Sequence, residues 1–183
     1  MVPKIAGRWY RSESRFGPLY HAELFPAQEN SGKLVTLVKQ NARLKALDSR
    51  FPLVIVDGPP GIGCPVIATA AGAHLALIVT EPSVAGIHDL ERIYKTVSHF
   101  KIPALVIINK ADINYEGTEH IVRICAGLGI EVISHIPFDP SVIEALIEGE
   151  PVTCYKPYSP ASQAMIASWQ VTSARLETIG EHR

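Results

Sequence analysis

The chain has 183 residues, of which 47% are hydrophobic and 19% are charged, and its formal net charge is −1. This balance is typical of one globular domain with an aliphatic core, and it excludes a global basic field that would attract nucleic acid or anionic lipid. The cysteines, Cys64, Cys125 and Cys154, are three in number and far apart. They argue against a disulfide framework and favour a cytoplasmic location.

The first fifty residues predict two short strands, at 7–14 and 17–25, followed by a helix at 29–47. A nucleotide-binding α/β domain normally begins with a strand and a phosphate-binding loop. The only Gly-Lys pair, Gly32–Lys33, fails the G-x-x-x-x-G-K-[ST] pattern, because Ala27 and Leu34 occupy two defining positions. We read Lys33 as a solvated lysine, with an approach of residues 31–33 to a phosphate as the alternative.

Residues 51–183 alternate between short apolar runs and helical patterns, which predicts βα units and a C-terminal helix. The least polar stretch, 64–80, is read as turn, helix and strand, and no membrane span is expected. Thr118 and Ser141 are predicted to begin two of the helices, Gly129 and Gly149 to end them, and Ser159 and Pro160 to open the last helix. The expected fold is one α/β domain over 1–183, and its predicted strands are 53–56, 74–80, 104–110 and 131–137.

The stretch "VIVDGPPGIGCPV", residues 54–66, ends an apolar run on Asp57 and continues into a glycine-rich turn. An aspartate at the carboxyl end of a buried strand, before such a turn, is where nucleotide-binding α/β proteins hold Mg²⁺. The structural alternative is that Asp57 caps the turn, whose glycines then serve only its tight backbone.

A second motif, "NKAD" at 109–112, follows the third apolar run. The spacing N-K-x-D is also that of the guanine-reading motif of GTPases, in which the aspartate accepts hydrogen bonds from the base. On spacing alone, Asn109 and Asp112 therefore argue for GTP.

The chain resembles the MinD/ParA superfamily of P-loop ATPases. The resemblance rests on the order of several stretches along the chain, which are the one at 54–66, "GRWYRSESRFGPLYHAEL" before it, and "VIINKADIN" and "HIPFDPSV" after it. More narrowly, they resemble the MinD-like ATPases that carry an inserted ferredoxin domain. Those proteins begin with a lysine-rich P-loop, which is followed by an insert with two four-cysteine clusters. Because neither occurs here, the chain looks like the carboxyl-terminal part of such a protein. Its doubly wound, mostly parallel sheet is then expected to be incomplete at the N-terminus.

The resemblance implies a role for each part of the two motifs. Asp57 looks like the catalytic Walker B acid, which holds Mg²⁺ through water. The turn after it looks like a sensor of the γ-phosphate, and Asn109 and Asp112 look like base-recognition residues. The loop after the fourth predicted strand looks like the other wall of the base site, with loop packing as the alternative. The turn residues are Gly58, Pro59, Gly61 and Gly63, and the loop residues are Pro137, Phe138 and Asp139.

The resemblance thus implies an ATPase that uses ATP and Mg²⁺ and is linked to iron–sulfur or redox chemistry. No C-x-x-C occurs, so we assign no iron–sulfur ligands. Without a P-loop, hydrolysis and nucleotide binding are expected to be weak. The expected partners are a nucleotide and either a second copy or a chain that supplies the missing half, with no nucleic acid. Two alternatives remain, a non-catalytic partner-binding remnant and a GTP-binding regulator that uses Asn109 and Asp112.

Overall fold

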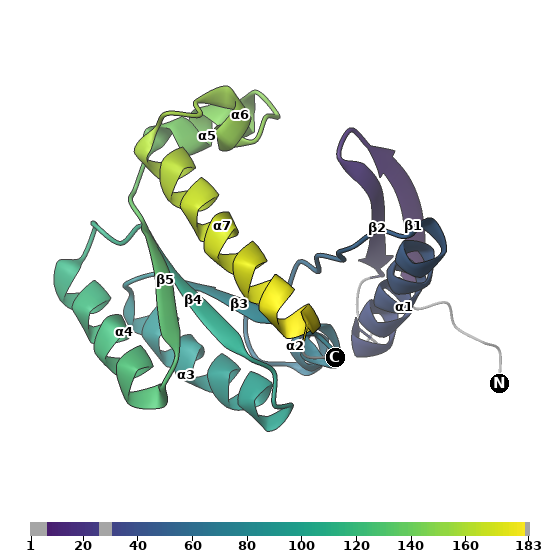
Figure 1. Cartoon of the computed structure of the whole chain (residues 1–183), viewed down its shortest axis with the longest axis horizontal. Helices are drawn as coiled ribbons and strands as arrows, with labels where there is room; N and C mark the ends of the chain where they lie inside the picture. Colours follow the sequence, from purple (N-terminus) through teal and green to yellow (C-terminus); the bar gives the residue numbers. More distant parts are fainter. Residues whose placement is uncertain (1–6, 26–30, 182–183) are drawn as a thin grey trace. The chain divides into compact units, whose positions relative to one another are not determined.

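The computed structural model describes residues 7–25 and 31–181, and the chain forms two compact units that meet in sequence at Ala71 and Gly72. We call them the amino-terminal unit and the carboxyl-terminal unit, and we describe each by itself (Figure 1).

The amino-terminal unit opens with a β-hairpin, as predicted. Strands β1 (Gly7–Ser14) and β2 (Gly17–Leu24) pair antiparallel, and the rings of Trp9 and Tyr20 stack with their centroids 6.4 Å apart. Helix α1 (Ser31–Ser49) packs against β2 and against α2 (Cys64–Ala70). The predicted helix at 29–47 is confirmed from Ser31 onward, and its first two positions lie outside the described residues.

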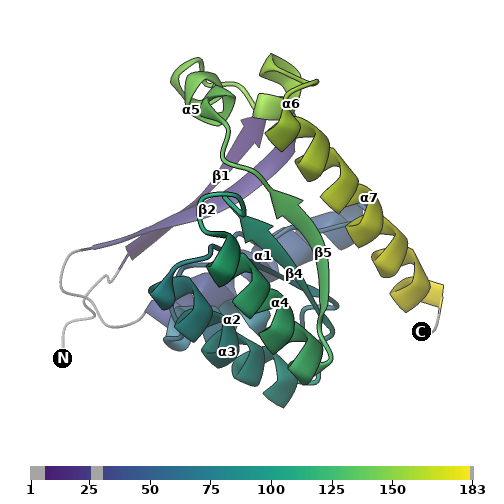
Figure 2. The same cartoon turned by 90° about the vertical axis from the view of Figure 1, so that its left-hand side faces the viewer.

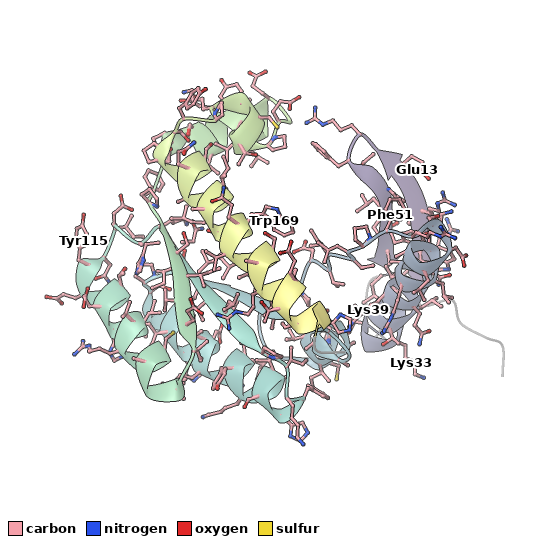
Figure 3. The ribbon with its side chains drawn as sticks, viewed as in Figure 1. Glu13, Lys33, Lys39, Phe51, Tyr115 and Trp169 are labelled. Atoms are coloured by element: carbon pink, nitrogen blue, oxygen red, sulfur yellow. The ribbon has the colours of Figure 1, made fainter. Side chains whose placement is uncertain are left out.

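A lysine ties the two helices of this unit together. The ammonium group of Lys39 on α1 donates hydrogen bonds to the carbonyls of Ala68, Thr69 and Ala71 at the end of α2, at 3.3, 2.5 and 2.6 Å (Figure 3). Burial lowers the pKa of this lysine. Because the last carbonyls of a helix have no partner within the helix, Lys39 supplies the charge and the donors that the end of α2 needs.

The predicted strand at 53–56 is wrong. Residues 51–63 form neither helix nor strand, and the side chains from Leu53 to Val56 are exposed, with Ile55 at 77%. A strand requires a neighbour that pairs with its backbone N–H and C=O groups, and the described residues provide none for this run. Apolar composition was therefore an insufficient signal here.

The carboxyl-terminal unit contains the other three predicted strands, and all three are confirmed. Strands β3 (Ala76–Thr80), β4 (Ala104–Asn109) and β5 (Glu131–Ile136) form a parallel sheet in that order. The described helices of the unit are α3 (Val84–His99), α4 (Tyr115–Leu128), α5 (Pro140–Ile147), α6 (Val152–Tyr155) and α7 (Pro160–Glu181).

This sheet lies between two helical layers, with α3 and α4 on one face and α7 across the other (Figure 2). Successive strand residues point to opposite faces, and β4 is apolar on both. Ile107 packs with Ile136 of β5 and Ala161 of α7, and Val106 and Ile108 are fully buried. The predicted α/β fold with a parallel sheet is thereby confirmed.

Candidate functional site

The carboxyl ends of the three parallel strands bring one group of predicted residues together. Asn109 ends β4 beside Ile136 of β5, and residues 137–139 follow Ile136 directly. Asp112 lies in the short connection from β4 to α4. In open α/β sheets this edge is where ligands bind, and the strand order places both motif segments there.

Asn109 is the polar side chain at this edge whose amide has no hydrogen-bond partner among the described residues. It is half-buried. An amide carries two donors and an acceptor, so it can satisfy both kinds of group on the edge of a purine base. Asn109 is therefore available to a ligand without breaking a contact inside the unit.

Lys110 and Glu81 form an ion pair at the same edge. The lysine ammonium lies 3.3 Å from the glutamate carboxylate, which joins the loop after β4 to the loop after β3. Lys110 adopts a positive φ of 52°, which is uncommon for a residue with a side chain. Sequence reasoning missed Glu81. Its position one residue after the end of β3, at the edge where Asn109 ends β4, is the signal that could have found it.

Asp112 is held by the loop that follows β5. Its Oδ1 accepts a hydrogen bond of 2.6 Å from the backbone N–H of Phe138. Next to it, the N–H of Ala111 donates to the carbonyl of Ile136 at 3.0 Å. The two loops at the ends of β4 and β5 are thus connected by a pair of hydrogen bonds, and the Phe138 ring remains 49% exposed.

Asp139 begins α5, which corrects the prediction that Ser141 does so. Its Oδ1 accepts from the N–H and the hydroxyl of Ser141, at 2.9 and 2.6 Å, and its Oδ2 accepts from the N–H of Ala161 at 3.2 Å. The hydrogen bond from the Ser141 hydroxyl is the main cause that lowers the pKa of Asp139 to about 2. Stabilisation by this carboxylate is complete above its unfolded pKa, near 4, and is lost as the pH falls toward 2.

Asn114 caps the start of helix α4, so the prediction that Thr118 caps this helix is also wrong. The Asn114 side chain accepts from the N–H of Gly117 and donates to the carbonyl of Pro82, both at 3.0 Å. Thr118 lies inside the helix, where its buried hydroxyl donates to the carbonyl of Ala111 at 2.7 Å. Both residues fix the loop that carries Asp112, which is a structural role.

The amino-terminal unit carries the other group of predicted residues, in the segment 51–63. Asp57 is exposed, and Gly58 follows it. Gly61 has a φ of 84°, a left-handed conformation that a residue with a side chain rarely adopts. Gly63 precedes α2, and its carbonyl accepts from Val66 at 3.0 Å. Pro59 is half-buried, and Pro60 lies between it and Gly61.

The chemistry of Asp57 suits a hard cation, since Mg²⁺ prefers carboxylate oxygens, phosphates and water. Within the described ranges, no group of three or more histidine, cysteine, aspartate or glutamate residues is placed to hold a metal ion. None of the described helices is long and apolar enough to cross a membrane.

Comparison with known proteins supports the fold and the class. No protein-family model matches the chain. An uncharacterized protein of Methanocaldococcus jannaschii is 35% identical over 97 residues, which is 53% of this chain and 34% of that protein. The septum site-determining protein MinD of Bacillus subtilis is 29% identical over 85% of this chain and 58% of its own. An iron-sulfur cluster carrier protein of Aquifex aeolicus is 26% identical over 68% of this chain and 38% of its own.

Solved structures give the same result for the fold. The MinD cell division protein of Aquifex aeolicus aligns with a TM-score of 0.66 and 23% identity, over 90% of this chain and 68% of that protein. MinD of Pyrococcus horikoshii, solved in complex with Mg-ADP, aligns with a TM-score of 0.59 and 21% identity, over 75% of this chain and 54% of that protein.

The parallel sheet with its helices, and the likeness to solved MinD structures, give the chain an α/β fold of the P-loop NTPase type. Its relatives and structural neighbours include MinD and ParA ATPases, so the resemblance to the MinD/ParA superfamily is confirmed. The chain spans about a third to a half of the length of the first curated relatives that it matches.

Proposed function

We propose that this chain is a nucleotide-binding part of a MinD-like ATPase and that its carboxyl-terminal unit holds the purine base. One observation carries the proposal: the Asn109 amide has no hydrogen bond among the described residues, and it ends the strand next to β5, whose following loop is held in place and carries the half-exposed ring of Phe138. The amide supplies hydrogen bonds to the base edge, and the ring supplies an apolar surface for the base. ATP is the proposed nucleotide, supported by relatives that are described as ATP-binding.

In the amino-terminal unit, we propose that Asp57 takes part in binding Mg²⁺ and that Gly61 approaches the γ-phosphate. The exposure of Asp57 and the open space around Gly61 support these roles, because each leaves room for a ligand. The Mg²⁺ ion would neutralise charge on the phosphates. Asp57 would orient the water molecules of that ion.

The phosphate-binding loop must come from outside these 183 residues, since the sequence contains no G-x-x-x-x-G-K-[ST] pattern. The backbone amides and lysine of such a loop stabilise several kcal/mol of transition-state charge. Hydrolysis by these residues alone should therefore be very slow. We propose that a strand leading to that loop pairs with β3, whose outer edge is unpaired among the described residues.

A nucleotide titration followed by NMR of the 183-residue chain tests the base site. We expect ATP to shift the backbone signals of Asn109, Phe138 and their neighbours, with millimolar affinity. Asn109→Ala should abolish these shifts, whereas Asn41→Ala on α1, whose amide only donates to the carbonyl of Leu37, should leave them unchanged. Shifts that avoid the sheet edge, or shifts that survive Asn109→Ala, would refute the base site.

A second candidate is a non-catalytic partner-binding role, which the exposed apolar side of β3 favours. Leu77 and Val79 are 42% and 60% exposed, beside an unpaired strand edge. Association with a second copy or a missing half would cover them. Light scattering after size-exclusion chromatography should show a mass that rises with concentration and reverts to a monomer in Val79→Lys. Val84→Lys is the matched control, because Val84 is already 88% exposed at the start of α3.

We also propose a link to iron–sulfur chemistry, supported by the similarity to an iron-sulfur cluster carrier protein. Two of the free thiols, Cys64 and Cys154, are exposed, and the third, Cys125, is buried. A cluster bound by this chain would require thiolates from elsewhere as well. Anaerobic reconstitution with iron and sulfide, followed by absorption spectroscopy, tests whether the chain takes up any cluster.

A further inference from the structure

We propose that Asp112 is a positioning residue that fixes the Phe138 loop and thereby makes the base site select adenine over guanine. This inference rests on the proposed nucleotide-binding function. It gives Asp112 of the NKAD motif a positioning role in place of direct recognition of the base. The observation behind it is the 2.6 Å hydrogen bond from the N–H of Phe138 to Oδ1 of Asp112.

The hydrogen bond joins residues 26 positions apart, so it connects two loops that the sequence separates by a whole helix and a strand. Charged acceptors form short and strong hydrogen bonds with backbone N–H groups. The neighbouring bond runs the other way, because the N–H of Ala111 after β4 donates to the carbonyl of Ile136 at the end of β5. Together the two hydrogen bonds fix the position of the Phe138 backbone relative to the end of β4.

The far side of the same loop is fixed independently. Asp139 accepts hydrogen bonds from Ser141 on α5 and from Ala161 on α7, so the residue after Phe138 cannot move without disturbing two helix starts. The Phe138 backbone is therefore held from both sides, by Asp112 on one and through Asp139 on the other. Only its ring is free to meet a ligand, which is the arrangement expected of a rigid wall.

The hydrogen bond that Asp112 accepts from Phe138 decides whether the site selects adenine or guanine. Guanine presents two adjacent donors, its N1–H and its amino group, and an aspartate that reads them uses both carboxylate oxygens. Here Oδ1 accepts from the N–H of Phe138, which orients the carboxylate toward the loop, so that it does not present both oxygens to one base edge. A single amide such as Asn109 satisfies the acceptor and the amino donor on either edge of adenine, whereas on guanine it would satisfy O6 and N1–H and leave the amino group without a partner. The geometry favours adenine, although the letters N-K-A-D alone suggest guanine.

The test compares the wild-type chain with Asp112→Asn, Asp112→Ala and the control Asp89→Ala. Asparagine keeps an oxygen that can accept from Phe138, whereas alanine does not. Asp89 is a half-exposed carboxylate of α3, and its Oδ1 lies 3.7 Å from Nδ1 of the adjacent His88. The first readout is amide hydrogen exchange of Phe138. We expect protection in the wild type, Asp112→Asn and Asp89→Ala, and exchange at least about 10-fold faster in Asp112→Ala.

The second readout is the ratio of ATP to GTP affinity, measured by NMR titration of the same four proteins. We expect the wild type and Asp112→Asn to prefer ATP, and Asp112→Ala to lose most of that preference. Equal exchange of Phe138 in the wild type and Asp112→Ala would overturn the proposal. So would a preference of the wild type for GTP that both Asp112 variants lose, because that result identifies Asp112 as a guanine reader.

The two proposals fail in different ways. A chain that binds neither nucleotide refutes the proposed base site and, with it, the selection of adenine, whereas the exchange of Phe138 still shows whether Asp112 holds the loop. Circular dichroism of Asp112→Ala shows whether this variant keeps its fold. Asp112→Asn, which retains a hydrogen-bond acceptor, gives a second measurement of both readouts.

Discussion

Two five-residue runs of this chain have nearly the same sequence and opposite environments. Residues 53–57 read Leu-Val-Ile-Val-Asp, and residues 105–109 read Leu-Val-Ile-Ile-Asn. The second run is the centre of the parallel sheet, with Ile107 only 4% exposed. In the first run the corresponding Ile55 is 77% exposed, and no strand forms.

The difference shows that an apolar run becomes a strand only when its backbone is paired. The run at 105–109 is paired on both sides, by β3 and by β5, and it is covered by helices on both faces. Hydrogen-bond partners far away in sequence therefore decide the outcome.

The largest expected effect comes from truncating the two matched isoleucines. Ile107→Ala should lower the free energy of unfolding of the carboxyl-terminal unit by about 2–5 kcal/mol, because it leaves a cavity in a packed core. Ile55→Ala should change the stability of its own unit by less than about 0.5 kcal/mol. The two tryptophans, Trp9 and Trp169, lie in different units, so urea unfolding of Trp9→Phe and Trp169→Phe backgrounds reports each unit separately.

A large loss of stability in Ile55→Ala would contradict the difference in burial between the runs at 53–57 and 105–109. It would mean that the run at 53–57 is buried in solution, by a second copy or by another segment. Repeating the measurement at two protein concentrations distinguishes these explanations, since burial by a second copy depends on concentration.

The next largest effect is expected for one of two glycines of the carboxyl-terminal unit, when each is replaced by alanine and the free energies of unfolding are compared. A Cβ at Gly86 would lie 2.4 Å from the carbonyl oxygen of Glu81, so Gly86→Ala must displace the turn between β3 and α3. We expect a loss of about 1–3 kcal/mol in unfolding experiments. Gly127→Ala, on α4 with open space around it, should instead stabilise the unit by up to about 1 kcal/mol. A neutral Gly86→Ala would show that the edge near Glu81 is loosely held.

The sequence predicted the elements better than it predicted their connections. Strands β3, β4 and β5 were recognisable because each combines an apolar run with flanking turn residues. Of the helix starts, the one at Ser159 and Pro160 was identified correctly, since α7 begins at Pro160. Thr118 and Ser141 were assigned wrongly, because the true first residues, Asn114 and Asp139, are chosen by contacts with Pro82 and Ala161 that lie far away in sequence.

The candidate site was predictable to the same extent. Strand order predicted that Asp57, Gly61, Asn109 and Phe138 share one edge, because parallel strands end on the same side. The structure has Asn109 and Phe138 at the ends of β4 and β5, whereas the run before Asp57 forms no strand. The use of each side chain was not predictable, since Asp112 binds a backbone N–H 26 positions away whereas Asn109 binds nothing within the described unit. Only the three-dimensional positions distinguish an occupied carboxylate from an available amide.

Lys39 gives a smaller effect in the amino-terminal unit and tests how well its helices are held. Lys39→Met keeps most of the aliphatic side chain and removes the three hydrogen bonds to the end of α2. Because water can replace part of these contacts, we expect a loss of about 1–2 kcal/mol in the free energy of unfolding, reported by Trp9. Lys33→Met, at an exposed position on the same helix, should be neutral. Equal effects of the two variants would show that α1 and α2 are not joined through Lys39.

The smallest expected effect concerns the ion pair between Glu81 and Lys110. Both side chains are partly exposed, so solvent and salt screen their attraction, and Glu81→Gln still leaves an oxygen that accepts from the lysine. We expect a loss below about 1 kcal/mol at low salt, and a smaller one at 0.5 M salt. Glu91→Gln, an exposed position on α3, controls for the change in net charge. If Glu81→Gln is as costly at high salt as at low salt, the pair contributes through loop geometry at Lys110, whose positive φ it would then help to hold.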